Sequence, residues 1–213
     1  MTVAVIIPAY DEAETVGSVV AVCRQVPEIN EVIVVSDGST DRTAEVARRA
    51  GASRVVELHQ NHGKGAAMKI GVDHTPADVI MFIDADLVGL TTVHLSQLLM
   101  PVLHKQADMT LGLFEGGRFT SDFGQALAPF LSGQRALRRS LLDHVENMED
   151  SGYGVEILLT QATRRLGATV LEVPLEQLGQ RHKEEKVGLV RGFSQRLKMY
   201  WEIARSATKI QRR

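Results

Sequence analysis

The sequence contains a single cysteine and lacks any long apolar run. Cys23 has no second cysteine with which to form an intramolecular disulfide, and this usage fits a reducing cytoplasm. No apolar stretch reaches the ~20 residues that cross a bilayer, and the N-terminus enters a strand-like run without a basic signal region. We therefore expect a cytoplasmic protein without a transmembrane segment.

Internal repeats, low-complexity linkers and a large excess of one charge are also missing. The 213 residues carry a net charge of -2, with 44% hydrophobic and 23% charged residues, which is ordinary for a globular protein. This length suits one α/β domain and is short for two. Residues 186–213, however, hold eight basic residues against Glu202 alone. Such a segment can face solvent, a partner subunit, an anionic membrane or nucleic acid; we favour solvent or a partner and expect no nucleic acid.

Apolar runs rich in β-preferring residues alternate with helical patterns through the first part of the chain. The runs lie at 2–7, 31–35, 54–58 and 79–83, and Pro8 is expected to end the first. This alternation predicts an α/β fold, a mostly parallel sheet with helices on both faces.

The second part of the chain is less regular. It predicts a helix around 95–103, a strand at 109–113, a short strand entering a helix within 131–139, a helix at 155–166, a last strand at 169–173 ended by Pro174, and an amphipathic C-terminal helix at 190–204.

Two carboxylates stand at the end of the run at 79–83. Asp84 and Asp86 are separated by Ala85 alone, and carboxylates so close repel each other unless a cation or a proton lies between them. Hard oxygen ligands on a loop suit Mg²⁺ or Mn²⁺ carrying a phosphorylated substrate. The spacing alone also fits solvated loop acids or a helix cap.

Other polar clusters follow the remaining strands, and ligands bind beyond the carboxyl ends of strands in such sheets. The groups needed for a nucleotide-sugar diphosphate are therefore expected in one crevice. Backbone groups and one carboxylate after the first strand can hold ribose and base, a second carboxylate can accept from a base N–H, and a lysine between two glycines can approach phosphate. These candidates are Pro8, Ala9, Tyr10, Glu12, Asp37 and Lys64.

Four ordered motifs carry a family resemblance. Together they resemble the GT-A glycosyltransferases of the family 2 type, over roughly the first 90 residues, and four in order are specific where each alone is not. They are Pro8-Ala9-Tyr10-Asp11-Glu12, Ser36-Asp37-Gly38-Ser39, Asn61-His62-Gly63-Lys64-Gly65 and Asp84-Ala85-Asp86-Leu87.

The resemblance implies a GT-A, Rossmann-like fold in one domain. Residues 1–90 would form the nucleotide-sugar half, 91–185 the acceptor half and 186–213 a helical arm. It implies donor contacts from the first three motifs, Ser36 included, and from Asp84 and Ala85, with Asp86 and Lys64 in catalysis.

The later segments resemble glucosyl-3-phosphoglycerate synthases and their polyprenyl-phosphate hexosyltransferase relatives. The segments that carry this likeness are 117–120, 131–133 and 151–156, together with Arg135, Arg138 and Arg139. It implies acceptor binding by Gly117, Arg118 and Thr120, and it makes His182 a metal ligand with Asp84 and Asp86. It also implies that Tyr153 and Glu156 lie beside the donor sugar and the acceptor as catalytic residues. The family has Arg-x-His, whereas here Arg181 directly precedes His182.

Two groups of side chains keep alternative interpretations. Arg135, Arg138 and Arg139 can be a solvated face or guanidinium donors to an anionic acceptor, and we assign Arg135 to the acceptor site. Glu149 and Asp150 fit the catalytic base of inverting family 2 enzymes, whereas the phosphoglycerate resemblance implies retention.

The leading hypothesis is a Mg²⁺- or Mn²⁺-dependent hexosyltransferase, moving glucose from UDP-glucose to a small phosphorylated or carboxylated acceptor such as 3-phosphoglycerate. The nearest alternative uses a polyprenyl phosphate, with GDP-mannose as another donor and the C-terminal helix on the membrane surface. A haloacid-dehalogenase-type phosphatase and a non-catalytic nucleotide-sugar binder are alternatives of other classes. The apolar stripe at 190–204 can pack on the chain's own core or on a second subunit, and we expect a homodimer.

Overall fold

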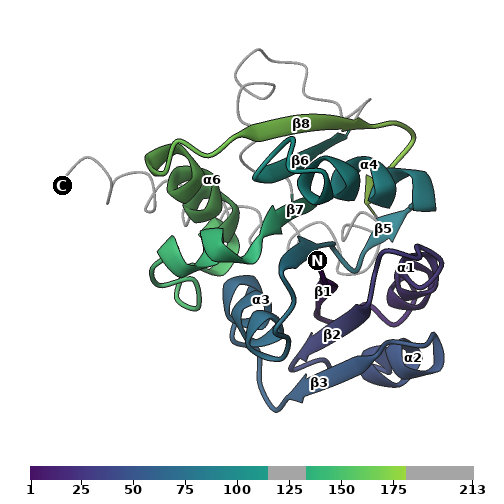
Figure 1. Ribbon diagram of the computed structural model, residues 1–213. Helices are drawn as coiled ribbons and strands as arrows, with labels where there is room; N and C mark the ends of the chain where they lie inside the picture. The colour runs from purple at the N-terminus through teal and green to yellow at the C-terminus, as the bar shows by residue number, and fades with distance from the viewer. Residues whose placement is uncertain (115–132, 181–213) are drawn as a thin grey trace, which may run out of the picture.

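The computed structural model describes residues 1–114 and 133–180. Its centre is a seven-stranded sheet with the order β3-β2-β1-β4-β7-β6-β8 (Figure 1). A separate ribbon pairs β5 (Leu87–Val88) with β9 (Gly179–Gln180). The strands of the large sheet are β1 (Val3–Ala9), β2 (Glu31–Asp37), β3 (Arg54–Leu58), β4 (Val79–Phe82), β6 (Met109–Phe114), β7 (Arg135–Arg138) and β8 (Val170–Leu175).

Strand direction brings distant segments to one edge of the sheet. β1 runs parallel to β2 and β4, and β2 runs parallel to β3. β7 is antiparallel to both β4 and β6, so Arg135 pairs with Phe82 beside the carboxyl end of β4. The edge that receives the ends of β1, β2 and β4 therefore also receives the beginning of β7. The predicted mostly parallel α/β sheet is confirmed.

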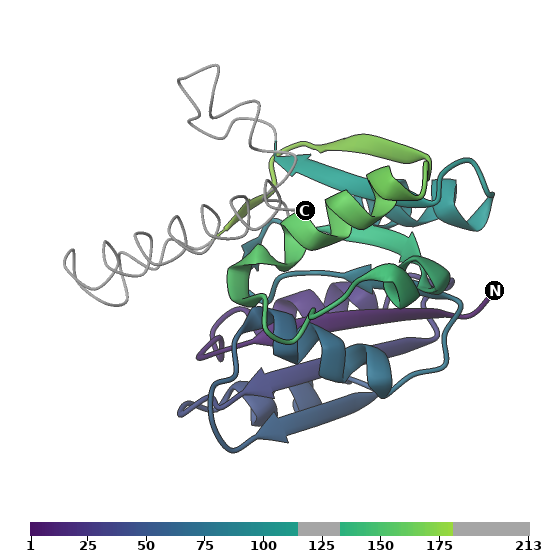
Figure 2. The ribbon, with the colours of Figure 1, turned by 90° about the vertical axis from the view of Figure 1, so that its left-hand side faces the viewer.

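Helices cover both faces, as predicted. Because side chains alternate along a strand, Val5 and Ile7 of β1 pack with α1 and α4, whereas Ala4 and Ile6 pack with α3 and α6. Figure 2 looks onto the second face, with α3 and α6 in front of the sheet. The helices are α1 (Val16–Cys23), α2 (Thr43–Arg49), α3 (Lys64–Asp73), α4 (Thr92–Leu103) and α6 (Val155–Arg165), with 3-10 turns η1 (Arg139–His144) and η2 (Gly152–Gly154).

The helix α3 brings its first turn directly to the strand ends. It begins at Lys64, and Gly63 precedes it with φ 94°, a backbone conformation that glycine adopts without steric cost. Farther along, a Cβ on Gly71 would collide with Ile6. The missing side chain lets α3 lie close against β1.

The prediction that Pro8 ends the first strand is wrong. β1 continues to Ala9, with Pro8 opposite Val35 of β2. The carbonyl of Ile6 accepts from the N–H of Ile83 on the β4 side, and residues two apart face the same neighbour. Proline therefore stands where its missing N–H would point past the end of β4.

Two later predictions also need correction, and one pairing was not predicted. Pro174 does not end the last strand, because β8 is the edge strand of the sheet and pairs on one side only, which tolerates proline. The segment after β7 forms the 3-10 turn η1 in place of the expected helix, and the β5–β9 ribbon was not predicted.

In residues 1–114 and 133–180, no helix has the length and hydropathy of a membrane-spanning segment. The predicted C-terminal helix at 190–204 lies outside these residues.

Candidate active site

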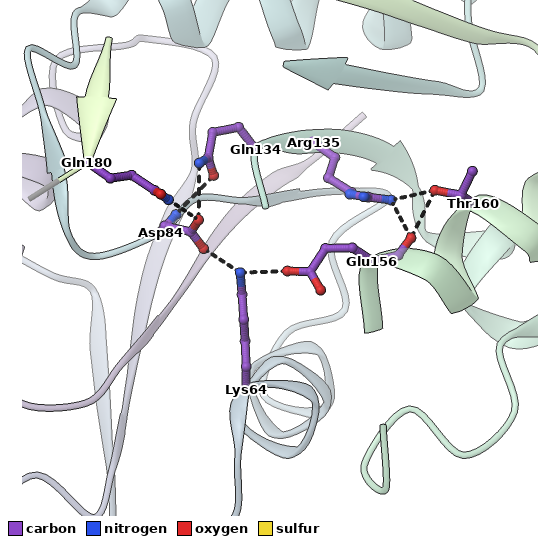
Figure 3. A network of polar contacts seen from close by, with 7 residues as sticks. All are labelled: Lys64, Asp84, Gln134, Arg135, Glu156, Thr160 and Gln180. Carbon is purple, nitrogen blue, oxygen red and sulfur yellow. Dashed lines mark hydrogen bonds and ion pairs between the residues drawn. The ribbon is translucent and has the colours of Figure 1, made fainter. Parts of the chain in front are cut away.

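Lys64 lies between two carboxylates from distant parts of the chain. Its Nζ is 2.7 Å from Oδ1 of Asp84, at the end of β4, and 2.6 Å from Oε1 of Glu156, in the first turn of α6 (Figure 3). The three side chains are 17%, 13% and 5% exposed. The structure therefore brings together three of the residues predicted for the donor site and catalysis.

The protonation state of Lys64 follows from this pairing. Burial alone would lower the pKa of its amine, but the charges and hydrogen bonds of Asp84 and Glu156 outweigh that cost and raise the pKa above its ordinary value. The amine is consequently a cation throughout the neutral range. It can supply positive charge to the site but cannot act there as a general base.

The second oxygen of Asp84 is held by two amides. Nε2 of Gln134 and Nε2 of Gln180 donate to Oδ2 at 3.1 and 3.0 Å, and the N–H of Asp84 donates to Oε1 of Gln134 at 3.4 Å (Figure 3). A Cβ on Gly133 would lie 2.5 Å from Oδ2 of Asp84 and 2.7 Å from Nζ of Lys64. The backbone at Gly133 thus passes directly over the ion pair.

Arg135 contacts the chain itself at this edge. Its side chain is completely buried, and Nη1 donates to the main-chain oxygen of Glu156 at 3.1 Å and to Oγ1 of Thr160 at 3.2 Å. Burial lowers the pKa of the guanidinium to about 10, against the opposing influence of Glu156 and Asp84. These contacts position α6 and differ from the acceptor contact that we predicted for Arg135.

Arg138 and Arg139 lie at the other end of β7, because the strand runs antiparallel to β4. Arg138 pairs with Asp108 at 3.3 Å. Arg139 donates to the carbonyls of Val72, in the last turn of α3, and of Thr75, just after that helix. These contacts match neither of the two interpretations given for the arginines, a solvated face or donors to an anionic acceptor. Both side chains join secondary-structure elements at the edge of the sheet opposite Asp84.

Asp37 supports the loop that carries Lys64. It is 3% exposed, and its Oδ1 and Oδ2 accept from the N–H groups of His62 and Gly63, both at 2.8 Å. The predicted base contact would have to share these oxygens with the backbone. In this structure Asp37 fixes the approach to the first turn of α3.

The loops after β1 and β2 are joined by polar contacts. Oδ1 of Asp11 accepts from the N–H of Thr40 at 2.8 Å, and the N–H of Asp11 donates to Oγ of Ser39 at 3.2 Å. Oγ of Ser36 donates to Oγ of Ser39 at 2.9 Å. These contacts give the predicted donor loops a defined shape.

The predicted donor residues at the end of β1 and in the loop after it differ in exposure. Ala9 and Glu12 are buried, and Oε2 of Glu12 accepts from Thr15 at 3.2 Å. Tyr10 is 40% exposed and Pro8 is half-buried. Tyr10 is therefore the most exposed of these four residues.

The acidic pair fits a hard divalent cation by its chemistry. Asp84 and Asp86 are half-buried carboxylates at one strand end, and Ala85 between them is buried. Within the described residues, no group of three or more His, Cys, Asp or Glu side chains gathers as a metal site. A third protein ligand would therefore come from elsewhere, and the predicted one, His182, lies outside those residues.

The other predicted site residues belong to the segments 117–120 and 149–153. Gly117, Arg118 and Thr120 lie outside the described part of the chain, and Tyr153 is described by its backbone alone, in η2. Glu149 and Asp150 are exposed on the turn before η2.

The sequence analysis missed Gln134 and Gln180. Gln134 stands between Gly133 and Arg135, two residues that carried the resemblance, so its position was a signal. Gln180 had no local signal, because only the pairing of β9 with β5 brings it to Asp84.

A family model decides the family of this chain. The model described as "Glycosyl transferase family 2" matches residues 4–154, which include Lys64, Asp84 and Asp86. The chain belongs to glycosyl transferase family 2. The predicted glycosyltransferase is confirmed at the level of family, and a haloacid-dehalogenase-type phosphatase is no longer supported.

Relatives of this family 2 chain include both classes named by the resemblance. A dolichyl-phosphate hexose transferase of Haloferax volcanii is 30% identical over 81% of this chain and 81% of its own length. A glucosyl-3-phosphoglycerate synthase of Mycolicibacterium smegmatis is 33% identical over 78% of this chain. The chain spans 65% of the length of that synthase and 64% of the length of another curated relative.

A solved relative shares the fold. The structure of glucosyl-3-phosphoglycerate synthase from Mycobacterium tuberculosis with Mn²⁺, UDP and glucosyl-3-phosphoglycerate is similar with a TM-score of 0.71 and 30% identity, covering 84% of this chain and 72% of that one. The predicted GT-A fold is thereby confirmed.

Proposed function

We propose that this family 2 chain transfers glucose from UDP-glucose to a small phosphorylated acceptor in the presence of Mn²⁺ or Mg²⁺. The observation that carries the proposal is the buried Lys64 cation held between Asp84 and Glu156 at the strand ends. The synthase from Mycobacterium tuberculosis, 30% and 32% identical in two of its structures, has been solved with Mn²⁺, UDP-glucose and glycerol 3-phosphate, and with Mg²⁺ and UDP.

The roles of the residues follow from charge and position. A cation held by Asp86 and Asp84, with His182 as a further ligand, would stabilise the negative charge that develops on the departing diphosphate. Lys64 holds the carboxylates of Asp84 and Glu156 on either side of its amine, at 2.7 and 2.6 Å. Glu156 presents its carboxylate where the resemblance places the donor sugar, and Asp37 and Asp11 shape the loops that would receive the nucleoside.

The acceptor end of the site is proposed from the resemblance. Gly117, Arg118 and Thr120 would bind the acceptor phosphate and carboxylate, and guanidinium donors suit such groups. Tyr153 would lie between donor sugar and acceptor. Stereochemistry follows the same proposal: retention needs no base from Glu149 or Asp150.

A second candidate function keeps the fold and the donor site. The dolichyl-phosphate hexose transferase matches this chain over a larger share of its own length, 81%, than the synthase does. A polyprenyl phosphate also offers a phosphate to the acceptor site. The predicted membrane contact of the segment 186–213 belongs to this alternative.

Nucleotide release tests both candidates in one assay. The chain is incubated with UDP-glucose or GDP-mannose and Mn²⁺ or Mg²⁺, with 3-phosphoglycerate or a short polyprenyl phosphate added in parallel. Release from UDP-glucose stimulated by 3-phosphoglycerate and abolished in Asp86→Asn supports the proposal. Stimulation by the lipid alone replaces it with the second candidate, and full activity after loss of both Asp84 and Asp86 contradicts both.

The domain organisation, the oligomeric state and the cellular location of the chain remain predictions. We propose one catalytic domain with the two halves 1–90 and 91–185 and an arm at 186–213, in a cytoplasmic homodimer. Size-exclusion chromatography with light scattering tests the dimer, and liposome flotation tests the membrane contact.

A further inference from the structure

Asp84 receives hydrogen bonds on both carboxylate oxygens from three different segments. Oδ1 faces Nζ of Lys64 at 2.7 Å, whereas Oδ2 accepts from Nε2 of Gln134 at 3.1 Å and from Nε2 of Gln180 at 3.0 Å (Figure 3). The amide of Gln134 is also oriented from its other end, because its Oε1 accepts from the N–H of Asp84. Turning that amide over would oppose donor to donor and acceptor to acceptor.

Gln180 reaches this position through the β5–β9 ribbon. β5 begins one residue after Asp86, and its Leu87 pairs with Gln180. The far end of the ribbon is tightly closed, because a Cβ on Gly89 would lie 2.8 Å from the carbonyl oxygen of Gln177. The acidic loop and β9 are thus fixed to each other on both sides of the pairing.

The charge of the site explains why neutral donors suit it. Lys64 is one cation between two carboxylates. A glutamine orients Oδ2 of Asp84 without changing this charge, whereas a carboxylate at either position would face Oδ2 directly and repel it. An additional lysine would compete with a divalent cation for the same oxygens.

We propose that Gln134 and Gln180 are positioning residues that fix the orientation of the Asp84 carboxylate for metal-dependent binding of the donor nucleotide. The proposal rests on the proposed function, because it takes Asp84 as part of the donor site. Without the amides, Asp84 can rotate and present both oxygens to Lys64. The nucleotide and its cation would then have to reorient Asp84 at the moment of binding.

The test is nucleotide binding by the full-length chain, measured by isothermal titration calorimetry with UDP in the presence of Mn²⁺. Gln180→Met keeps the length of the side chain and removes the donor, and Gln180→Glu replaces the donor by a carboxylate. Gln134→Met tests the second amide and substitutes for Gln180→Met if that variant does not fold. Gln106→Met, at an exposed glutamine after α4, is the matched control.

We expect the Kd for UDP to rise about tenfold in Gln180→Met and further in Gln180→Glu, as for other groups that orient metal-binding side chains. The melting temperature should stay at the wild-type value, and Gln106→Met should bind as wild type does. In steady-state assays the loss should fall on KM for the donor more than on kcat.

The outcomes separate this inference from the proposed function. If wild type binds UDP with Mn²⁺ but both methionine variants bind within twofold of it, the positioning role is wrong and the proposed function stands. If wild type binds neither UDP nor GDP with either cation, the proposed function itself fails. A loss of binding that matches a loss of folded protein would assign the amides to stability alone and overturn the inference.

Discussion

Nη1 of Arg135 donates to the main-chain oxygen of Glu156 at 3.1 Å from a side chain with no exposed surface. The same nitrogen reaches Oγ1 of Thr160, one turn farther along α6. Arg135 therefore joins the start of β7 to the first turn of the helix that carries Glu156 toward Lys64. A buried cation in such a place influences both stability and the geometry of the site.

We predict that Arg135→Met lowers the free energy of unfolding by about 3 kcal/mol, within the range for removing one partner of a buried charged contact. Urea unfolding followed by circular dichroism measures the change. Arg165→Met is the control. Arg165 is exposed in the last turn of α6, and its replacement should change stability little. Equal unfolding midpoints for the two variants would show that the Arg135 contacts contribute nothing.

Gly133→Ala is expected to damage the site more than the fold. Its new Cβ would stand 2.5 and 2.6 Å from the two oxygens of Asp84, so the ion pair with Lys64 must shift. UDP titrations with Mn²⁺ should show binding weakened by roughly tenfold or more, about 1.4 kcal/mol or above. Gly179→Ala is the control, because a Cβ there meets nothing within 4 Å. Similar UDP binding by both variants would show that a Cβ at position 133 does not displace the Asp84–Lys64 ion pair.

Asp37→Asn should loosen the loop before α3. Both oxygens of Asp37 accept backbone N–H groups at 2.8 Å, and an asparagine must oppose one of them with its own NH₂. We expect a loss of about 1–3 kcal/mol in unfolding free energy, together with a higher KM for the donor. Asp143→Asn, at an exposed position, serves as control, and an unchanged variant would mean that water replaces the lost acceptor.

Lys64 should remain charged, and its amine should resist acylation, across neutral and mildly alkaline pH. Its pKa is raised above the ordinary 10.5, so the stability that its ion pairs contribute is fully present below pH 10.5 and is lost only as pH rises through the higher folded-state value. Acylation by an N-hydroxysuccinimide ester between pH 7 and 9, read by peptide mass spectrometry, reports the neutral amine.

Labelling of Lys64 should be at least about tenfold slower than that of Lys69, since each unit of pKa changes the neutral fraction tenfold. Lys69 is a suitable reference because it also pairs with a carboxylate, Asp73, but is 43% exposed. Comparable labelling of the two lysines in folded protein would contradict the assigned pairing of Lys64 with Asp84 and Glu156.

Much of the fold was predictable because its signals are local. Apolar runs gave the positions of β1 to β4 within a few residues. The buried residues of α1, which are Val16, Val19, Val20 and Cys23, recur at helical spacing along the sequence. Parallel strands place their carboxyl ends at one edge. The convergence of Lys64 and Asp84 therefore followed from chain order alone.

Pro8 and Pro174 show where local rules failed. Each was expected to end a strand, yet both lie within one, because the consequence of a missing N–H depends on whether a neighbouring strand needs it. That neighbour is known only once the sheet is assembled. The antiparallel direction of β7 is likewise known only from the assembled sheet. It places Arg135 beside Phe82 at the end of β4, and Arg138 beside Val79 at the start of that strand.

The sequence by itself determined the family, the first four strands and the polar residues at their ends, since each depends on neighbouring residues or on a short motif. The tertiary structure alone decided which groups meet: Glu156 with Lys64, Gln180 with Asp84, and Arg135 with α6. These pairs are 21 to 96 residues apart, and their contacts depend on strand direction and register, which no local pattern specifies.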